Sequence, residues 1–207
     1  ASEAKTEAQT EAKAEDAKAE DTKAETEAAK DEAASGEKHL VGVAMPTKDL
    51  QRWNQDGSNM KAELEAAGYE VDLQYASNDV QTQVSQVENM ISNGCELLVI
   101  ASIDGSSLGE PLGQAKEAGI PVISYDRLLM NSDAVTYYAT FDNYMVGQKQ
   151  GEYLVEALGL EENDGPFNIE MFTGDPADNN CNFFFGGAMD VLQPYIDSGK
   201  LVVKSGQ

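Results

Sequence analysis

Positive charge is scarce in this 207-residue chain, which has 14 Lys and Arg residues against 37 Asp and Glu residues and a net charge of −23. A surface of this sign repels nucleic-acid phosphates, and no basic stretch offsets it, so nucleic acid is excluded as a partner. The chain also has a single histidine and two distant cysteines, Cys95 and Cys181. No metal-ligand spacing results, and we expect no metal. The cysteines are expected to be unpaired apolar residues, with a disulfide left open.

Residues 1–38 contain no Val, Ile, Leu, Met or aromatic residue. With alanine as their only apolar content, they cannot bury enough surface to offset the entropy cost of ordering. Their Ala/Glu/Lys repetition predicts a disordered, acidic and semi-rigid tether. A coiled coil is disfavoured because no apolar seam repeats along the segment.

Long apolar runs are missing as well: none approaches the ~18 residues of a membrane span, and no signal peptide is visible. A tether implies something to be tethered to. We therefore expect an extracytoplasmic protein from which an N-terminal export signal or lipid anchor has been removed.

From residue 39 onward the pattern alternates between buried strands and amphipathic helices, which predicts β-α-β units and a parallel sheet flanked by helices, an α/β fold. The strands are predicted at residues 39–45, 69–76, 95–102, 120–125, 135–141, 167–173 and 200–205. The helices are predicted at residues 50–67, 78–92, 106–118, 142–158 and 178–196.

The same unit recurs after residue 141, so the pattern divides the chain into two lobes. Residues 39–141 form the predicted N-terminal lobe, and residues 142–207 begin a second lobe. Its few elements cannot bury their own faces, so we expect the chain to be part of a longer protein.

In open parallel sheets, ligands bind beyond the carboxyl ends of the strands. Hydrogen-bonding side chains with fixed planes, and the only tryptophan, follow the strands here. The candidate ligand-binding residues are Lys48, Arg52, Trp53, Asp126, Arg127, Asn179 and Asn180. Carboxylates, amides and guanidinium groups exchange paired hydrogen bonds with vicinal hydroxyls, and an indole packs on the C–H face of a pyranose. This set suits a neutral sugar, whereas a phosphate cofactor is disfavoured because neither GxGxxG nor GxxxxGK[ST] occurs.

Each candidate has a purely structural alternative. Trp53 can be a core residue of the first helix, and the Asp126–Arg127 pair an ordinary surface ion pair. The run 178–180 can be a helix N-cap, and Asp104 is expected to cap rather than to bind.

One motif points to a different class of protein. Residues 105–109 read Gly-Ser-Ser-Leu-Gly, which fits the G-x-S-x-G pattern of a hydrolase nucleophile. A catalytic triad needs a histidine later in the chain, and none follows His39 in these 207 residues, so a hydrolase would need one from residues beyond Gln207. We therefore expect a turn that caps a helix, and a protein that is not an enzyme.

Several segments together resemble one family: KDLQRWNQDG, VSQVENMISNGCELLVIASIDG, PVISYDRL, YYATFDN, GPFNIEMFTGDPADNN and MDVLQPYIDSGKL. From about residue 40 to the end, the chain resembles bacterial sugar-binding proteins of the xylose-binding and multiple-sugar-receptor type. These are type I periplasmic binding proteins, which supply ABC importers.

The resemblance implies two α/β lobes joined by a three-strand hinge, with one monosaccharide, an aldopentose or aldohexose, bound between them. It implies that Arg52 and Trp53, with Lys48 nearby, form the first wall of the cleft, with the indole stacked on the sugar. Asp126 and Arg127 would bind ring hydroxyls, and Asn179 and Asn180 would contribute amides from the second lobe. Further ligand contacts would lie beyond Gln207.

The expected function is delivery of the sugar by a monomeric, cell-surface lipoprotein or periplasmic protein to an ABC permease, without a cofactor. The alternative is a sugar-sensing module that signals to a receptor kinase or chemoreceptor. A cytosolic repressor of the same fold is disfavoured because the chain has an acidic tether in place of a helix-turn-helix.

Overall fold

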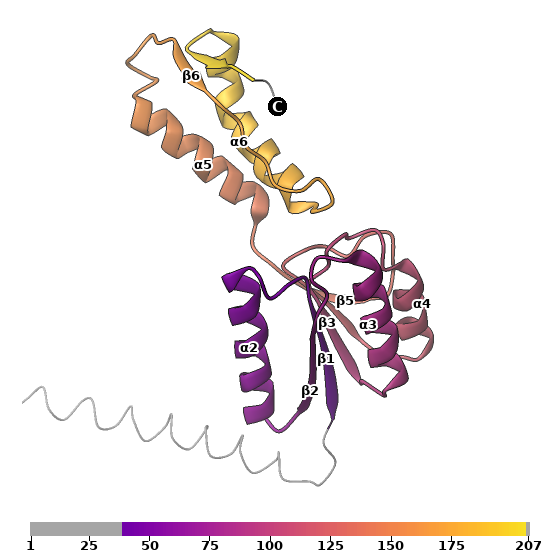
Figure 1. Ribbon diagram of the computed structural model, residues 1–207. Helices are drawn as coiled ribbons and strands as arrows, with labels where there is room; N and C mark the ends of the chain where they lie inside the picture. The colour runs from indigo at the N-terminus through magenta and orange to yellow at the C-terminus, as the bar shows by residue number, and fades with distance from the viewer. Residues whose placement is uncertain (1–38, 206–207) are drawn as a thin grey trace, which may run out of the picture.

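The computed structural model describes residues 39–205, which form two parts that follow one another along the chain (Figure 1). The predicted tether at residues 1–38 lies outside the described residues. The first part is built on a five-stranded sheet and the second on a two-stranded sheet.

The first sheet is wholly parallel, with the strand order β2-β1-β3-β4-β5. Its strands are β1 (Leu40–Met45), β2 (Glu70–Tyr75), β3 (Leu97–Ile100), β4 (Val122–Tyr125) and β5 (Val135–Ala139). Strand β1 lies between β2 and β3, and its Val43 is paired with Leu73 on one side and Val99 on the other. Because all five strands run in the same direction, their carboxyl ends meet at one edge of the sheet.

Helices cover both faces of this sheet (Figure 1). Helix α2 (Gln51–Ala66) lies on one face, and α3 (Val80–Ser92) and α4 (Gly109–Glu117) lie on the other. Alternate residues of β1 point to opposite faces: Val43 packs in the cluster under α2, and Ala44 packs in the cluster under α3 and α4. Both residues are fully buried, so the near-continuous apolar strand follows from a sheet covered on both sides.

Helix boundaries depend on local caps. Asp79 is the N-cap of α3 and accepts a hydrogen bond from Thr82 N at 2.7 Å, so the helix begins after Asp79 rather than at Asn78. Asp104 accepts from Ser106 N at 2.8 Å and thereby closes a turn ahead of α4. Hence α4 begins at Gly109, three residues later than the sequence predicted. The expectation that Asp104 caps this helix is wrong: the N-cap position is Leu108, and no side chain makes a capping hydrogen bond there.

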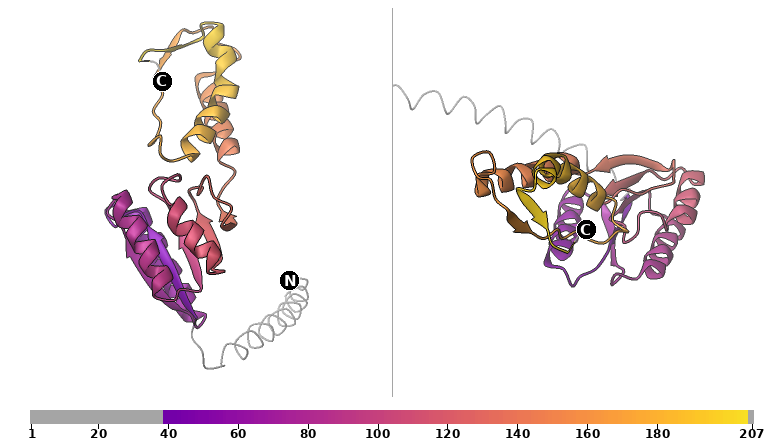
Figure 2. Two further views of the ribbon diagram at one scale, coloured as in Figure 1. Left: turned by 90° about the vertical axis from the view of Figure 1, so that its right-hand side faces the viewer. Right: turned by 90° about the horizontal axis from the view of Figure 1, so that it is seen from above.

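The second part consists of α5 (Asn143–Leu158), β6 (Phe167–Ile169), α6 (Asn180–Asp197) and β7 (Leu201–Val203). Strands β6 and β7 are parallel, and α5 packs directly along α6. Its small core contains Leu160, Leu192 and Leu201. Figure 2 shows this part beyond the edge of the first sheet, joined to it through the segment after β5.

Both cysteines are unpaired, as expected. Burial, and secondarily the negative charge of Asp72, raises the pKa of the Cys95 thiol from 9.0 to about 11. Cys95 is therefore a neutral packing residue at physiological pH. Across residues 39–205, no helix is both long and apolar enough to cross a membrane.

Candidate functional site

The residue at the end of β4 has an unusual backbone. Asp126 has φ of +61°, a left-handed conformation that is rare outside glycine. Its N–H donates to Ala139 O at 2.8 Å, which ties the end of β4 to the end of β5. Its carbonyl oxygen accepts from the Tyr138 hydroxyl, the Thr140 hydroxyl and the Asn180 amide, each at 3.1 Å. Strained residues that are held by so many contacts cluster at functional sites.

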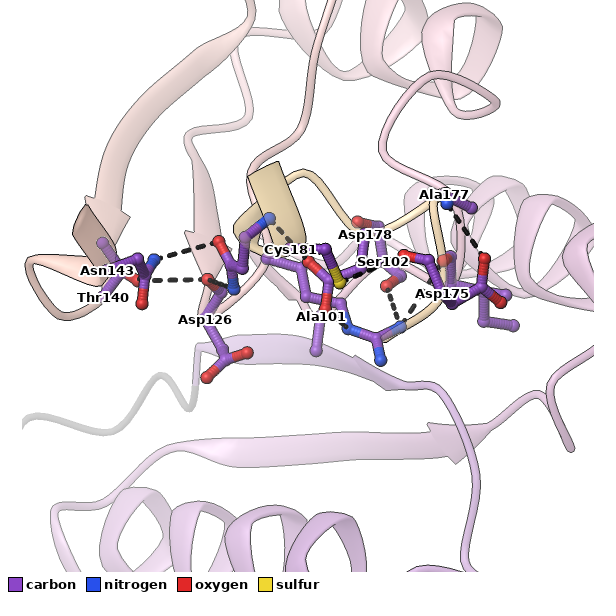
Figure 3. A network of polar contacts seen from close by, with 12 residues as sticks. Ala101, Ser102, Asp126, Thr140, Asn143, Asp175, Ala177, Asp178 and Cys181 are labelled. Atoms are coloured by element: carbon purple, nitrogen blue, oxygen red, sulfur yellow. Dashed lines mark hydrogen bonds and ion pairs between the residues drawn. The ribbon is translucent and has the colours of Figure 1, made fainter. Parts of the chain in front are cut away.

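Asn180 brings the second part of the chain to this point. It stands at the start of α6 and is 4% exposed. Its side-chain oxygen accepts from Asn143 Nδ2 at 3.0 Å and from the Tyr138 hydroxyl at 3.3 Å. The amide thus connects α5, α6 and the loop after β4, and Figure 3 shows Asn143, Thr140 and Asp126 together in this network.

The Asp126 carboxylate points to the first helix instead of to its neighbour Arg127. Its Oδ2 lies 2.5 Å from Arg52 Nη2. Arg52 Nε lies 3.3 Å from Asp56 Oδ2, which also accepts from the Tyr125 hydroxyl at 3.2 Å. Burial lowers the pKa of Arg52, but hydrogen bonds and charges of Asp126 and Asp56 outweigh it and leave that pKa above its ordinary value. The half-exposed guanidinium thus lies as a positive fork between two carboxylates.

Arg127 makes a separate set of contacts. Its Nη1 donates to Ser102 O at 3.1 Å and to Ile103 O at 3.4 Å, both in the segment after β3. Its Nε lies 3.1 Å from Asp178 Oδ2 in the second part, as an ion pair without hydrogen-bond geometry. Asp126 and Arg127 are therefore not a surface ion pair with each other, because each pairs with a distant residue.

Trp53 is a core residue of the first part. It is 3% exposed and packs in the cluster between α2 and the sheet. The guanidinium carbon of Arg52 lies 4.4 Å from its ring centre, and that of Arg127 lies 5.3 Å away. This geometry corrects the expectation of an indole open to a ligand: the apolar ring on the buried face of α2 is stabilised by removal from water, and the two guanidinium groups lie over its face.

A pocket of about 400 Å³ opens beside these groups. It is lined by Arg52, Asp56, Tyr125, Asp126, Ala139, Thr140 and Phe141. Phe141 is 71% exposed, so this pocket has an open aromatic face that Trp53 does not provide. Its size and its few convergent polar groups are typical of a small-molecule site.

Two predicted site residues lie apart from this group. Lys48 is exposed, and its ammonium lies 4.9 Å from the centre of the Tyr75 ring. Asn179 accepts from Asn182 Nδ2 at 3.3 Å within its own turn. The structure therefore brings together Arg52, Trp53, Asp126, Arg127 and Asn180, and leaves Lys48 and Asn179 at the margin.

Several residues of this hydrogen-bond network were not predicted from the sequence. Tyr138 lies in β5, Thr140 follows the end of that strand, and Asn143 is the first residue of α5. Ser124, fully buried in β4, donates to Arg127 O at 2.7 Å and accepts from Leu129 N at 2.9 Å, which fixes the loop that carries Asp126. Polar residues within a strand or hinge are visible in the sequence, but their partners are not.

The Gly105–Gly109 turn has no arrangement for nucleophilic catalysis among residues 39–205. The Ser107 hydroxyl donates to Asp104 O at 3.2 Å, within its own turn. The Asp104 carboxylate holds Ser106 through its N–H and its hydroxyl, which lowers the pKa of Asp104. The turn is structural.

Comparison with known families identifies the fold. The model of the periplasmic binding protein domain matches residues 41–206. The chain belongs to the periplasmic binding protein family. The predicted resemblance and the α/β fold class, a parallel sheet flanked by helices, are thereby confirmed.

Two relatives within this family have names that refer to sugars. The multiple sugar-binding periplasmic receptor ChvE of Rhizobium radiobacter is 58% identical over 173 residues, which cover 84% of this chain and 49% of ChvE. The D-xylose-binding periplasmic protein of Escherichia coli strain K12 is 37% identical over 167 residues, which cover 81% of this chain and 48% of that protein. The chain spans about half the length of the curated relatives it matches.

Two solved structures of periplasmic binding proteins are also similar. An ABC transporter solute-binding protein from Clostridium phytofermentans with bound β-D-glucose is 78% identical, with a TM-score of 0.79, over 81% of this chain and 52% of that one. The fructose-binding periplasmic domain of a hybrid two-component system is 25% identical, with a TM-score of 0.67, over 80% and 52%. In a fold of this family, the site described above lies at the carboxyl ends of the strands.

Proposed function

We propose that this protein binds one monosaccharide, an aldopentose or aldohexose, between its two lobes and delivers it to an ABC importer. The observation that carries the proposal is the convergence of Arg52 and Asp126 on a pocket with an exposed aromatic ring, Phe141. The names of the sugar-binding relatives and the glucose in the Clostridium structure support the same ligand class.

The chemistry fits a neutral polyol. The Asp126 carboxylate accepts hydrogen bonds, the Arg52 fork donates them, and Phe141 offers an apolar face to ring C–H groups. Each well-placed hydrogen bond contributes about 1 kcal/mol net, so a handful together with stacking outweighs the cost of ordering. Binding of this kind needs no reaction, which is why we propose a binder rather than an enzyme.

Closure of the lobes is the proposed signal to the partner. Asn180 and Asp178 of the second lobe already contact Asp126 and Arg127 of the first. A sugar that bridges the same groups would stabilise the closed arrangement, which a permease recognises. We propose a monomer outside the cytoplasm, tethered to the membrane through its N-terminal segment.

A sensing role is the second candidate. The similar periplasmic domain of a hybrid two-component system shows that this fold also serves signal transduction. Stimulation of the ATPase activity of a reconstituted permease by the sugar-loaded protein would support import. Binding to a receptor kinase without such stimulation would support sensing.

The first test is a titration of the protein as its gene encodes it with xylose, glucose and galactose. Trp53 is the only tryptophan of the 207-residue sequence and lies under Arg52 and Arg127, so we expect its emission, identified by comparison with a Trp53→Phe variant, to change when a sugar engages these cations. A rise in melting temperature should accompany binding. The absence of both responses to every common aldose would contradict the sugar assignment.

A further inference from the structure

Helix α3 carries a polar side chain in the middle of the core. Gln83 is 1% exposed. The sequence predicts an apolar face at Val80, Val84, Val87 and Ile91, and Gln83 interrupts the buried surface next to it. A buried amide is costly unless its donor and acceptor are both satisfied.

Both ends of the Gln83 amide bind the backbone after β3. Its Nε2 donates to Ala101 O at 2.9 Å, and its Oε1 accepts from Ile103 N at 2.8 Å. The side-chain amide therefore makes the pair of hydrogen bonds that a neighbouring strand would make. It fixes the position of residues 101–103, where the sheet ends.

The same three-residue segment holds Arg127. The carbonyl oxygens of Ser102 and Ile103, which lie on either side of the Ile103 N–H that Gln83 binds, accept from Arg127 Nη1. Figure 3 shows Ala101 and Ser102 beside this guanidinium contact, within the network that leads to Asp178. The orientation of Arg127 thus depends on residues 101–103, which the Gln83 side chain of α3 holds in place.

We infer that Gln83 is a positioning residue for the ligand site: it holds the segment after β3 so that the Arg127 guanidinium keeps a single orientation, between that segment and Asp178 of the second lobe. Gln83 itself touches no ligand. The inference rests on the proposed function, since it assigns Arg127 a part in binding the sugar, but its structural half can be tested without any sugar.

The test is Gln83→Met, which keeps the length of the side chain and removes both hydrogen bonds. We expect sugar affinity to fall about five- to tenfold, the effect of one to two hydrogen bonds lost indirectly. In the sugar-free protein, Trp53 emission should also shift, because Arg127 lies 5.3 Å from its ring centre.

Gln86→Met is the matched control. Gln86 lies on the same helix and donates to Tyr75 O at 3.1 Å, at the end of β2 rather than β3. We expect Gln86→Met and Gln83→Met both to lower the melting temperature. Gln86→Met should leave sugar affinity and the Trp53 emission near those of the wild type. Equal effects of the two variants on sugar affinity would mean that Gln83 contributes only to the stability of the fold, and would overturn the inference.

A double-mutant cycle shows whether Gln83 acts through Arg127. In an Arg127→Ala background, Gln83→Met should change affinity by less than about twofold, because the guanidinium to be positioned is gone. A full five- to tenfold loss in that background would also overturn the inference. If the wild type binds no sugar, the proposed function fails, while an unshifted Trp53 emission in Gln83→Met would refute the positioning role separately.

Discussion

At the scale of single residues, the site depends on one strained backbone. Asp126 keeps φ of +61° because its N–H and carbonyl groups make four hydrogen bonds to the surrounding chain. A non-glycine residue in this conformation costs about 1–2 kcal/mol. This backbone conformation directs the Asp126 carboxylate away from Arg127 and toward Arg52, at the mouth of the pocket.

Two substitutions separate the strain at Asp126 from its chemistry. Asp126→Ala and Asp126→Gly both remove the carboxylate, and each should weaken sugar binding at least tenfold, about 1.4 kcal/mol. Only alanine keeps the backbone penalty, so urea unfolding should show Asp126→Gly more stable than Asp126→Ala by about 1 kcal/mol. Isothermal titration gives the affinities.

Equal stability of the two variants would contradict the strain assignment. Retained affinity in both would remove Asp126 from the ligand site. Asp126→Asn, which tolerates the same φ, is the control that changes the charge alone.

At the scale of elements, the second lobe depends on the close approach of α5 and α6. A Cβ atom at Gly147 would collide with the Phe184 carbonyl, and one at Gly187 would collide with the Tyr144 carbonyl. Two helices that meet backbone to backbone need glycine at the contact, which explains a high glycine content in helices that propensity alone would disfavour.

Gly147→Ala should therefore destabilise the second lobe, although alanine is the better helix former. We expect a loss of about 1–3 kcal/mol from overpacking, measured by urea unfolding. Gly186→Ala is the matched control, since a Cβ there would lie 3.7 Å from the Tyr144 ring, an ordinary contact. It should be neutral or stabilising by up to about 1 kcal/mol. A Gly147→Ala protein as stable as Gly186→Ala would contradict the close packing.

The sequence predicted the order of the helices and strands well. Parallel strands that helices cover on both faces appear as continuous apolar runs, and the helices appear as segments whose apolar residues recur every three to four positions. It placed the start of α4 three residues early, because Asp104 closes a separate turn ahead of the helix instead of capping it. It also predicted that Arg52, Asp126, Arg127 and Asn180 lie near one another beyond the strand ends, as their contacts show, while their part in ligand binding stays a prediction. It could not show that Trp53 is buried or that Gln83 supports the loop, since both depend on contacts between residues distant in the chain.

At the scale of the whole molecule, polar groups connect the two lobes. Asp178 uses both carboxylate oxygens: Oδ1 accepts from Asn180 N at 3.0 Å at the start of α6, and Oδ2 pairs with Arg127 of the first lobe. The Arg127 and Asp178 side chains are only 20% and 15% exposed, so salt screens their attraction less than that of a surface pair. The relative position of the lobes should thus depend on this charge pair.

Asp178→Asn tests that dependence, because asparagine can still accept from Asn180 N while it lacks the charge that attracts Arg127. In the sugar-free protein, we expect small-angle X-ray scattering to show a larger radius of gyration than in the wild type, as the lobes separate about the segment after β5. Asp175→Asn is the matched control: Asp175 accepts from Ala177 N at 2.9 Å in the same loop. Its radius of gyration should equal that of the wild type. The same expansion in both variants would mean that the loop, and not the Arg127–Asp178 pair, holds the lobes together.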